Sequence, residues 1–363
     1  MKAVQGKDFG EIEAMLSVEK DVPVPRLADL AAKERATSML IRTHAVALAP
    51  GDIRVLSGRT REMQGPPSFP YIPGGDCCGT VVELPMNAKD LPFSIGDRVA
   101  ARFVDGPRGA LGEYAIVSTR VADLVPESLA SEEAAALPAM SLAELVSKGE
   151  RVLVLGAAGG VGSHLCQILR ARSVSFLVGV SDSPMHVMAP PISCDAAVDY
   201  TKEDIFAQVE FQVNPFDTII DLASNGWPRL LQSANMKHSL IVKPAVAGGR
   251  FLTLTPDQHS FDCHSLWQLL QLFVFPTLWR AFVTRTWYRS RLPAYKYVLA
   301  LQDNNEGLRK TFELNKANQL SAILHNNNPF PFTTQGVREA FRVQESRHTK
   351  GKVVVHVADA DVS

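Results

Sequence analysis

The sequence predicts an α/β protein with two domains. Its 363 residues exceed what a single hydrophobic core organises, which is about 250–300 residues. Up to residue 125, short runs of alternating apolar and polar residues are separated by turn signals, which is typical of antiparallel strands. From residue 126 onward, apolar strands alternate with helical windows, which predicts a parallel sheet with crossover helices. We therefore place one domain at 1–125 with 319–363 and the other at 126–318.

The first domain is predicted to be an antiparallel β-barrel, because its strands are short and evenly interrupted by Gly and Pro. The predicted strands are 38–42, 79–83, 97–101 and 113–117. A helix is predicted to begin at Ser131, where the run Ser131-Glu132-Glu133 provides a cap before several alanines. The apolar run 351–357 is predicted to return to this domain as one more strand.

The second domain is predicted to contain a parallel sheet. Its strands are expected at 151–155, 175–180, 218–222, 239–242 and 250–254, and a helix at 163–172. Continuous apolar runs of this kind are typical of strands that helices cover on both faces. An apolar and aromatic helical insertion is expected within this domain at about 256–294.

The composition is that of a globular protein, with 46% hydrophobic and 21% charged residues. A formal net charge of -1 produces no global field that would attract nucleic acid. The five cysteines show no CxxC spacing, so neither a disulfide framework nor a zinc site of that type is predicted. No targeting segment is evident at the N-terminus, and a cytoplasmic location is the default expectation.

A glycine-rich turn, Gly156-Ala157-Ala158-Gly159-Gly160-Val161-Gly162, links the first parallel strand to its helix. Such a turn directs unpaired backbone N–H groups and the positive end of the helix dipole at one point, which suits a pyrophosphate. Gly156 makes the sharp exit, the next glycines admit the phosphates, and Gly162 lets the helix pack on the sheet. The predicted dinucleotide contacts are Gly156, Ala158, Gly159, Gly160, Val161 and Gly162. A tight turn without a ligand is the alternative.

The end of the second parallel strand predicts which dinucleotide binds. A carboxylate there would hold the ribose 2′-hydroxyl of NAD, but this chain has Ser181. The small hydroxyl leaves room for a 2′-phosphate, so NADP(H) is favoured over NAD(H), although the neighbouring Asp182 opposes it. An ordinary loop serine is the alternative interpretation of Ser181.

A series of short motifs also occurs in a characteristic order along the chain. They are Ala49-Pro50-Gly51-Asp52, Pro73-Gly74-Gly75-Asp76, Gly96-Asp97-Arg98-Val99, Gly112-Glu113-Tyr114, the glycine turn, and Gly351-Lys352-Val353-Val354. Together they resemble the zinc-free quinone oxidoreductase (zeta-crystallin-like) branch of the medium-chain dehydrogenases/reductases over nearly the whole chain. The resemblance implies a GroES-like β-barrel domain plus a Rossmann domain with a doubly wound parallel sheet, and an active site in the cleft between them. It also implies a likeness in function: reduction of quinones, enones or other carbonyl compounds by direct hydride transfer from NADPH, often in a homodimer.

The resemblance further implies that metal sites are absent. Zinc-dependent relatives carry a Gly-His-Glu run where this chain has Gly74-Gly75-Asp76, and they also have a cysteine cluster that is missing here. Cys77 and Cys78 are then most simply buried core residues. For the 2′-phosphate, family members use a Ser or Gly, a Lys and a Tyr. Ser181 and Tyr200 match, but Met185 occupies the Lys position.

Other departures from the family pattern affect the expected chemistry. Ala49 and Arg54 replace an Asn and a Tyr that face the nicotinamide in relatives, and the stretch from Pro138 to Gly149 is shorter than in the family. An alternative function is therefore a catalytically weakened dehydrogenase-fold subunit, acting as a nucleotide-binding assembly or scaffold component. The candidate catalytic residues are Tyr114, as a proton donor in competition with water, and Asp52, as an anchor of the cleft loop. Purely structural roles are the alternative for both.

The insertion combines apolar, aromatic and basic residues. Residues 266–283 are strongly apolar, and arginines then alternate with Trp and Tyr. A transmembrane span is not expected, because Pro276 and Arg280 interrupt the run. We favour helices packed at the cleft or at a dimer interface. The second interpretation is a membrane-surface helix through 266–291, which would give access to a lipophilic substrate, and single-stranded nucleic acid ranks last. This segment resembles the mitochondrial reticulon-4-interacting protein 1 group, which makes a mitochondrial location the alternative.

Overall fold

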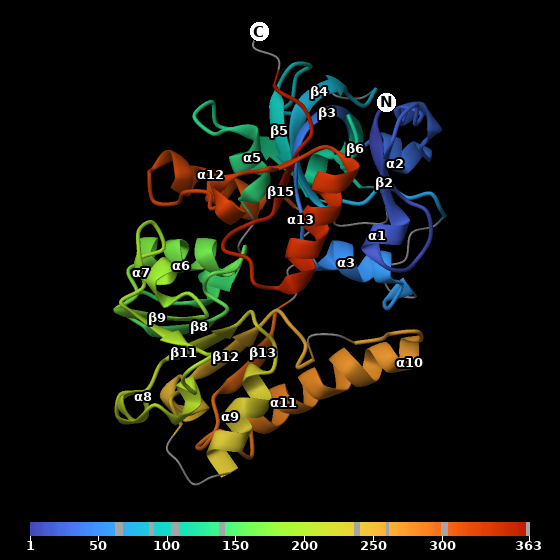
Figure 1. Cartoon of the computed structure of the whole chain (residues 1–363). Helices are drawn as coiled ribbons and strands as arrows, with labels where there is room; N and C mark the ends of the chain where they lie inside the picture. The colour runs from blue at the N-terminus through green and yellow to red at the C-terminus, as the bar shows by residue number, and fades with distance from the viewer. Residues whose placement is uncertain are drawn as a thin grey trace. The chain divides into compact units, whose positions relative to one another are not determined.

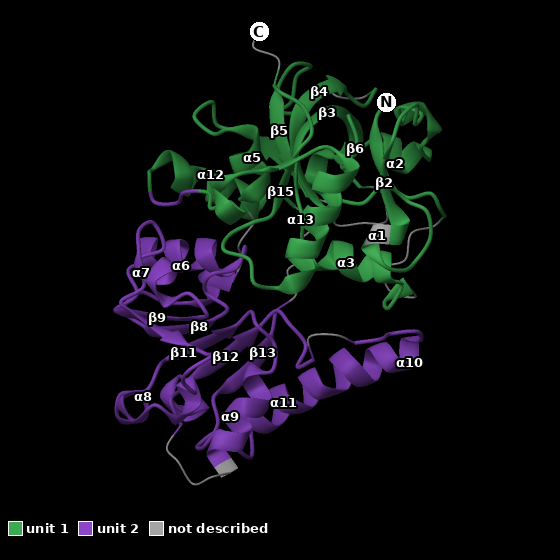
Figure 2. Ribbon diagram, viewed as in Figure 1, with its two compact units in different colours: residues 1–139, 301–318, 322–363 green, residues 140–300, 319–321 purple. Residues whose placement is uncertain are grey.

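The computed structural model describes residues 1–61, 68–86, 91–102, 109–137, 142–235, 240–258, 261–298 and 304–360. The chain forms two compact units, coloured separately in Figure 2. Unit 1 contains residues 1–139, 301–318 and 322–363, and unit 2 contains residues 140–300 and 319–321.

Unit 1 is built on a seven-stranded, mainly antiparallel sheet (Figure 1). The strand order is β14-β15-β3-β4-β5-β7, and β6 pairs with β3. These strands are β3 (Ser38–Ala47), β4 (Asp76–Glu83), β5 (Arg98–Ala101), β6 (Tyr114–Ser118), β7 (Ala122–Leu124), β14 (Phe330–Pro331) and β15 (Val354–His356). Each strand predicted for this domain falls on one of them, which confirms the antiparallel part of the predicted fold.

Short helices and one small sheet complete unit 1. The sheet pairs β1 (Ala3–Gly6) with β2 (Leu16–Glu19). The helices include α1 (Ile12–Met15), α2 (Ala32–Arg35), α3 (Pro50–Ser57), α5 (Ser131–Ala136), α12 (Glu306–Lys316) and α13 (Thr334–Ser346). The core is formed by alternating side chains of β3, β4 and β5 together with the apolar face of α13, and Met39, Ile41, Val81, Val99 and Phe341 are fully buried in it.

The two units differ from the predicted domain boundaries of 125/126 and 318/319. Helix α5 belongs to unit 1, since Ser131 Oγ lies 3.2 Å from His44 Nδ1 on β3. The residues around α12 also belong there, and Asn305 Nδ2 donates to the carbonyl of Ala122 at 3.0 Å. Residues 319–321 belong to unit 2, because Ser321 exchanges two hydrogen bonds with the side chain of Gln167. Long-range contacts of this kind leave no signal in local sequence patterns.

Unit 2 is built on a six-stranded parallel sheet of order β10-β9-β8-β11-β12-β13 (Figure 1). Its strands are β8 (Arg151–Leu155), β9 (Phe176–Ser181), β10 (Ala196–Asp199), β11 (Thr218–Asp221), β12 (Arg250–Thr253) and β13 (Ala294–Tyr297). The chain begins at the central strand β8, moves outward to β9 and β10, and then returns to β11 on the other side. This order is that of a doubly wound Rossmann sheet, as predicted.

One predicted strand of this domain is wrong. Residues 240–242 form only an isolated bridge between Val242 and Phe216, and Ser239 lies outside the described residues. The other four predicted strands are β8, β9, β11 and β12, and the predicted helix is α6 (Gly162–Ala171). The run around 240–242 is buried beside the sheet, and its apolar character reflects that burial rather than strand pairing.

The insertion forms one continuous helix from Leu266 to Arg285, made of α10 (Leu266–Leu269), a π-helical turn (Leu270–Val274) and α11 (Phe275–Arg285). By length and composition it could cross a membrane, with a mean hydropathy of 1.2, and only 6% of its apolar window is buried. The expectation that Pro276 and Arg280 interrupt the run before it reaches the length of a membrane span is therefore wrong. Pro276 follows the π-helical turn directly, and such a turn accommodates a residue that cannot donate a backbone hydrogen bond. Arg280 forms an ion pair with Asp257.

The packing of α6 on β8 gives the first prediction. A Cβ atom at Gly162 would lie 2.1 Å from the carbonyl oxygen of Gly156, closer than any real contact. We expect Gly162→Ala to lower the free energy of unfolding by about 1–3 kcal/mol or more, because the backbone must shift. The control is Gly159→Ala, since a Cβ there meets only Gly156 O at 3.7 Å. Equal thermal unfolding of the two variants would contradict this account.

Candidate dinucleotide site

The glycine-rich segment has the geometry that its sequence predicts, namely strand, turn and helix. Strand β8 ends at Leu155, residues 156–161 form the turn, and α6 begins at Gly162. Gly156 has a φ of +82°, which an L side chain rarely adopts. The backbone N–H groups of Gly156 and Ala157 both donate to the carbonyl of Val180 on β9, at 3.1 and 3.0 Å. These two bonds fix the start of the turn against the neighbouring strand.

Four further amides of the turn have no partner within unit 2. Among the described residues of that unit, nothing accepts a hydrogen bond from the backbone N–H of Ala158, Gly160, Val161 or Gly162, whereas Gly159 N donates to Gly156 O at 3.4 Å. They lie at the N-terminus of the ten-residue helix α6, where the helix dipole adds positive potential. The side of Gly159 is open, because a Cβ there would contact only Gly156 O. This arrangement fits the diphosphate of a dinucleotide.

The turn lies where the sheet reverses its direction of winding. Strand β8 is flanked by β9 on one side and β11 on the other, and ligands of open α/β sheets bind at the carboxyl ends of the strands at this position. The loop after β11, residues 222–226, is packed against Gly156, and Ala223 Cβ would lie 3.4 Å from a Cβ at Gly156. The predicted cofactor turn and this loop therefore form one edge of unit 2.

The loop 222–226 was not identified from the sequence. Asp221 is buried at the end of β11 and accepts hydrogen bonds from the N–H groups of Ala223 at 3.0 Å and Gly226 at 2.9 Å. Burial raises the pKa of Asp221 to about 6. Ser224 and Asn225 both have positive φ, at 66° and 64°, so the loop is held in an uncommon conformation. The sequence feature that could have identified this loop is the run Asp221-Leu-Ala-Ser-Asn-Gly226, which starts at the end of an apolar strand.

The residues predicted to select the cofactor gather at the ends of β9 and β10. Ser181 is buried, lies in register with Asp199, and its Oγ accepts a hydrogen bond from Ser183 N at 3.0 Å. Asp182 Oδ1 accepts a hydrogen bond from Ser183 Oγ at 3.1 Å. Tyr200 is 44% exposed, and its pKa is raised by partial burial and by the charges of Asp182 and Asp199. Ser181 and Tyr200 therefore lie at the same end of the sheet, together with the carboxylates of Asp182 and Asp199.

One cation at this position was missed by the sequence analysis. Lys202 Nζ lies 2.8 Å from Asp199 Oδ2, and hydrogen bonds from Lys202 and Thr201 lower the pKa of Asp199 to about 2. Met185, at the position where relatives carry a lysine, lies on α7 (Pro184–Met188) and is 77% exposed. Lys202 follows Tyr200 by two residues, and that spacing was the only sequence signal for it.

Asp52 in unit 1 has a clear structural role. It is buried on α3, and its carboxylate accepts hydrogen bonds from Ala49 N at 2.8 Å and Gly74 N at 3.2 Å. Burial raises the pKa of Asp52 to about 6, with a further contribution from the charge of Asp76. Lys352 Nζ lies 2.9 Å from Asp76 Oδ2 and neutralises that carboxylate. Asp52 therefore ties the start of α3 to the loop at Gly74.

Tyr114, the other candidate catalytic residue, begins β6 and is paired in register with Arg42. Its ring packs against an apolar cluster that contains Leu27, Leu30 and Ile116. In the part of the chain that the structure covers, no contact is found between Tyr114 and Asp52. Both residues belong to unit 1, whereas every predicted cofactor residue belongs to unit 2.

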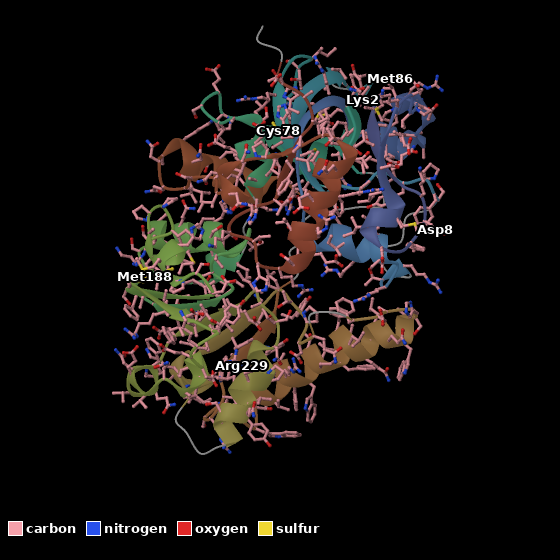
Figure 3. All side chains as sticks on the ribbon, viewed as in Figure 1. Lys2, Asp8, Cys78, Met86, Met188 and Arg229 are labelled. Atoms are coloured by element: carbon pink, nitrogen blue, oxygen red, sulfur yellow. The ribbon has the colours of Figure 1, made fainter. Side chains whose placement is uncertain are left out.

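The described residues contain no group of three or more His, Cys, Asp or Glu side chains arranged to hold a metal ion. Asp76, at the position of the glutamate in zinc-dependent relatives, is paired with Lys352. Cys77 and Cys78 are both buried (Figure 3 labels Cys78), and burial raises the pKa of the Cys78 thiol to about 12. Neutral, buried thiols are poor metal ligands and nucleophiles.

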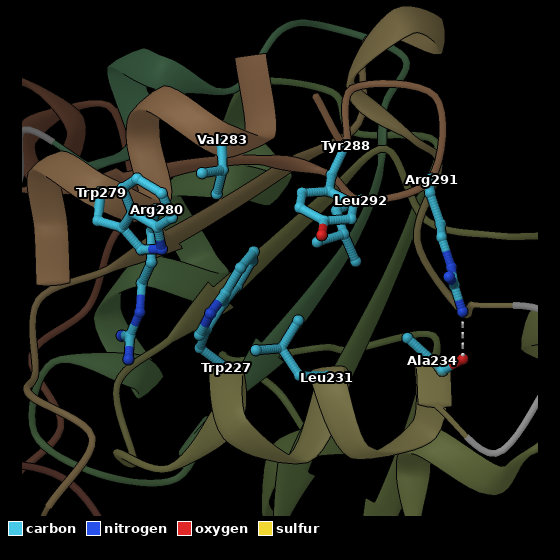
Figure 4. Close-up of a pocket in the computed structure, with 9 residues that line it drawn as sticks. All are labelled: Trp227, Leu231, Ala234, Trp279, Arg280, Val283, Tyr288, Arg291 and Leu292. Carbon is cyan, nitrogen blue, oxygen red and sulfur yellow. Dashed lines mark hydrogen bonds between the residues drawn. The ribbon is translucent and has the colours of Figure 1, made fainter. Parts of the chain in front are cut away.

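A cavity of about 390 Å³ lies elsewhere in unit 2, between α9 (Gly226–Asn235) and α11 (Figure 4). Its lining includes Trp227, Leu231, Val283 and Leu292, and it contains none of the predicted cofactor residues. This cavity is therefore separate from the residues predicted to bind the dinucleotide.

Two family models match the sequence. The first is the alcohol dehydrogenase GroES-like domain, over residues 35–127, and the second is the zinc-binding dehydrogenase model, over residues 192–355. Together they cover most of the chain, and the first lies within unit 1.

Similar proteins are oxidoreductases. The 2-methylene-furan-3-one reductase of Solanum lycopersicum is 28% identical over 98% of this chain and 79% of its own length. The mitochondrial NAD(P)H oxidoreductase RTN4IP1 of Bos taurus is 26% identical over 88% of this chain and 81% of its own length. The solved quinone oxidoreductase of Coxiella burnetii superposes with a TM-score of 0.71 at 24% identity, and the match covers 98% of this chain and 99% of that one.

The hydrogen bonds of Asp52 give the second prediction. Asp52→Ala removes the acceptor of two backbone N–H groups, so we expect the free energy of unfolding to fall by about 1–2 kcal/mol. Nucleotide binding to unit 2 should remain within about twofold of the unaltered protein, a difference below 0.5 kcal/mol. Chemical denaturation and nucleotide titration measure the two effects. Full stability combined with lost turnover would instead assign Asp52 a catalytic role.

Proposed function

Because the chain belongs to the medium-chain dehydrogenase/reductase superfamily, in its quinone oxidoreductase branch, we propose that it reduces quinones, enones or related carbonyl compounds with NADPH. The observation that carries the proposal is the set of backbone amides at 158 and 160–162, which have no acceptor among the described residues of unit 2. The names of similar proteins support the substrate class, since they include a furanone reductase, an alkenal/one oxidoreductase and a quinone oxidoreductase.

The arrangement of the site suggests a separate role for each group of residues. When bound, the nicotinamide ring supplies the hydride. The glycine turn holds the diphosphate, the loop 222–226 forms an adjoining wall at the switch point, and Ser181 and Tyr200 face the adenosine ribose. The catalysis would be zinc-independent, because Gly74-Gly75-Asp76 provides neither a histidine nor an unpaired carboxylate. The proton would come from water or from Tyr114. We also propose a homodimer, on the family resemblance alone.

Titration with NADPH tests the proposed function and gives the third prediction. We expect NADPH to quench protein fluorescence and to raise the melting temperature. A Val at Gly159 would project into the space proposed for the diphosphate, so Gly159→Val should weaken NADPH binding at least about tenfold, or 1.4 kcal/mol. The fold should tolerate this change, because a Cβ at Gly159 meets only Gly156 O, at 3.7 Å. Indifference of the unaltered protein to both NADPH and NADH would remove the proposal.

We propose that NADP(H) is preferred over NAD(H), on the small side chain of Ser181 and on the presence of Tyr200 and Lys202. Asp182 limits this preference, because its carboxylate lies directly after Ser181 and acts on Tyr200.

The fourth prediction follows from Asp182. Asp182→Asn removes a negative charge beside the proposed 2′-phosphate, so we expect the ratio of NADPH to NADH affinity to rise several-fold, up to about tenfold, with the larger effect at low ionic strength. Binding of NADH should change little. The matched control is Asp195→Asn, an exposed change in the same unit whose native carboxylate pairs with Arg170. An unchanged ratio in Asp182→Asn would show that the 2′-phosphate binds elsewhere.

A second function, a catalytically weakened subunit that retains a nucleotide and serves in assembly, is favoured by Ala49 and Arg54. The structure places Ala49 N on the carboxylate of Asp52, and a methyl group offers no hydrogen bond to a nicotinamide. Residues 138–141 of the shortened stretch lie outside the described residues. Bound NADPH without reduction across a panel of quinones and enones would favour this second function over the first.

A further inference from the structure

The helix from Leu266 to Arg285 exposes a continuous apolar and aromatic face. Trp267, Phe275, Leu278 and Phe282 recur at helical spacing and are 59%, 47%, 62% and 50% exposed. Trp279 and Trp287 extend the face, with their ring centroids 5.8 Å apart and that of Phe282 5.4 Å from Trp287. We call these six residues the aromatic face. Contiguous exposure of this kind marks a binding surface.

The opposite side of the helix is fixed to the sheet of unit 2. Val283 and Thr284 are buried, and Tyr295 N on β13 donates to Thr284 Oγ1 at 3.1 Å. The helix connects β12 to the neighbouring parallel strand β13, so both of its ends return to one sheet. Its C-terminal part, α11, therefore packs on the sheet, whereas α10 projects beyond it (Figure 1), and the helix cannot leave the sheet to span a bilayer without breaking these contacts.

The charge around the aromatic face is positive. The chain has neither Asp nor Glu between Asp262 and Asp303, although its formal net charge is -1. Arg285, Arg289 and Arg291 are exposed in this stretch. Within the described ranges, no carboxylate pairs with any of the three. Exposed tryptophans beside arginines without a carboxylate partner are typical of proteins that bind at the interface of anionic membranes.

The cavity of Figure 4 opens beside the same face. Its lining combines the apolar side chains of Trp227, Leu231 and Leu292 with polar groups of Tyr288 and Arg291. Arg291 Nη2 donates to the carbonyl of Ala234 at 2.9 Å, shown as the dashed line. A cavity that combines apolar side chains with a guanidinium can accept the upper part of an acyl chain together with its anionic headgroup.

We propose that unit 2 binds the surface of an anionic phospholipid bilayer through the aromatic face, with Arg285, Arg289 and Arg291 on the headgroups. A second copy of the chain fits this face less well. A two-fold symmetric contact sets the same patch against itself, and this would bring the arginines of both copies together without a neighbouring carboxylate. An anionic lipid surface supplies the missing negative charge.

Vesicle sedimentation of the full chain tests the proposal. The unaltered protein should bind vesicles of phosphatidylcholine with phosphatidylglycerol and bind pure phosphatidylcholine vesicles at least about tenfold more weakly. The apolar variant, Leu278→Ser with Phe282→Ser and Trp287→Ser, should lose binding to both. The charge variant, Arg285→Gln with Arg289→Gln, should lose the preference for anionic vesicles, and salt should have the same effect on the unaltered protein.

The matched control is Val209→Ser with Val213→Ser, two exposed apolar residues of the same unit that are 69% and 80% exposed on α8 (Val209–Val213). It should bind vesicles as the unaltered protein does. Melting temperature and NADPH binding verify that each variant is folded. Two results would overturn the proposal: no vesicle binding by the unaltered protein, or equal binding by the apolar variant. Conversion of a dimer to a monomer by the apolar variant, without any vesicle binding, would assign the face to a second copy.

Discussion

The proposed chemistry depends on backbone amides in the turn after β8 that have no acceptor within unit 2. Two amides of the turn donate to Val180 O, and four others have no acceptor among the described residues of that unit. The parallel sheet imposes this asymmetry, because β8 must end and reverse into α6 at the switch point. Gly162 allows α6 to approach closely enough for its N-terminus to contribute to the same point. A diphosphate satisfies those amides without rearranging the turn.

The charges at the same edge of the sheet limit the preference for one cofactor over the other. Ser181 provides space for a 2′-phosphate, while Asp182 and Asp199 provide negative charge, and Lys202 pairs with Asp199. We therefore expect a smaller ratio of NADPH to NADH affinity than in a protein with a lysine in place of Met185. The exposed helix fits the proposed function, since a reductase of lipophilic quinones would benefit from a surface that binds the membrane in which such substrates dissolve.

Sequence patterns within a few residues predicted much of this architecture. Features that depend on contacts between distant residues could not be predicted in this way. The glycine turn, the strands of both sheets and helix α6 follow from patterns within a few residues. The run at 239–242 was misassigned because burial makes an apolar segment resemble a strand, whether or not it pairs. The continuity of the helix through Pro276 depends on a π-helical turn just before it, and the placement of α5, α12 and residues 319–321 depends on distant partners. The loop 222–226 became part of the site only through its contact with Gly156.

Residue-resolved amide hydrogen exchange, with and without NADPH, tests the central claim most directly. The account predicts that bound NADPH slows exchange at Ala158, Gly160, Val161 and Gly162, because their N–H groups then donate to the diphosphate. Gly156 and Ala157, already bonded to Val180 O, should change much less. NADPH bound at saturation with unchanged exchange at residues 158–162 would contradict the account and place the nucleotide elsewhere.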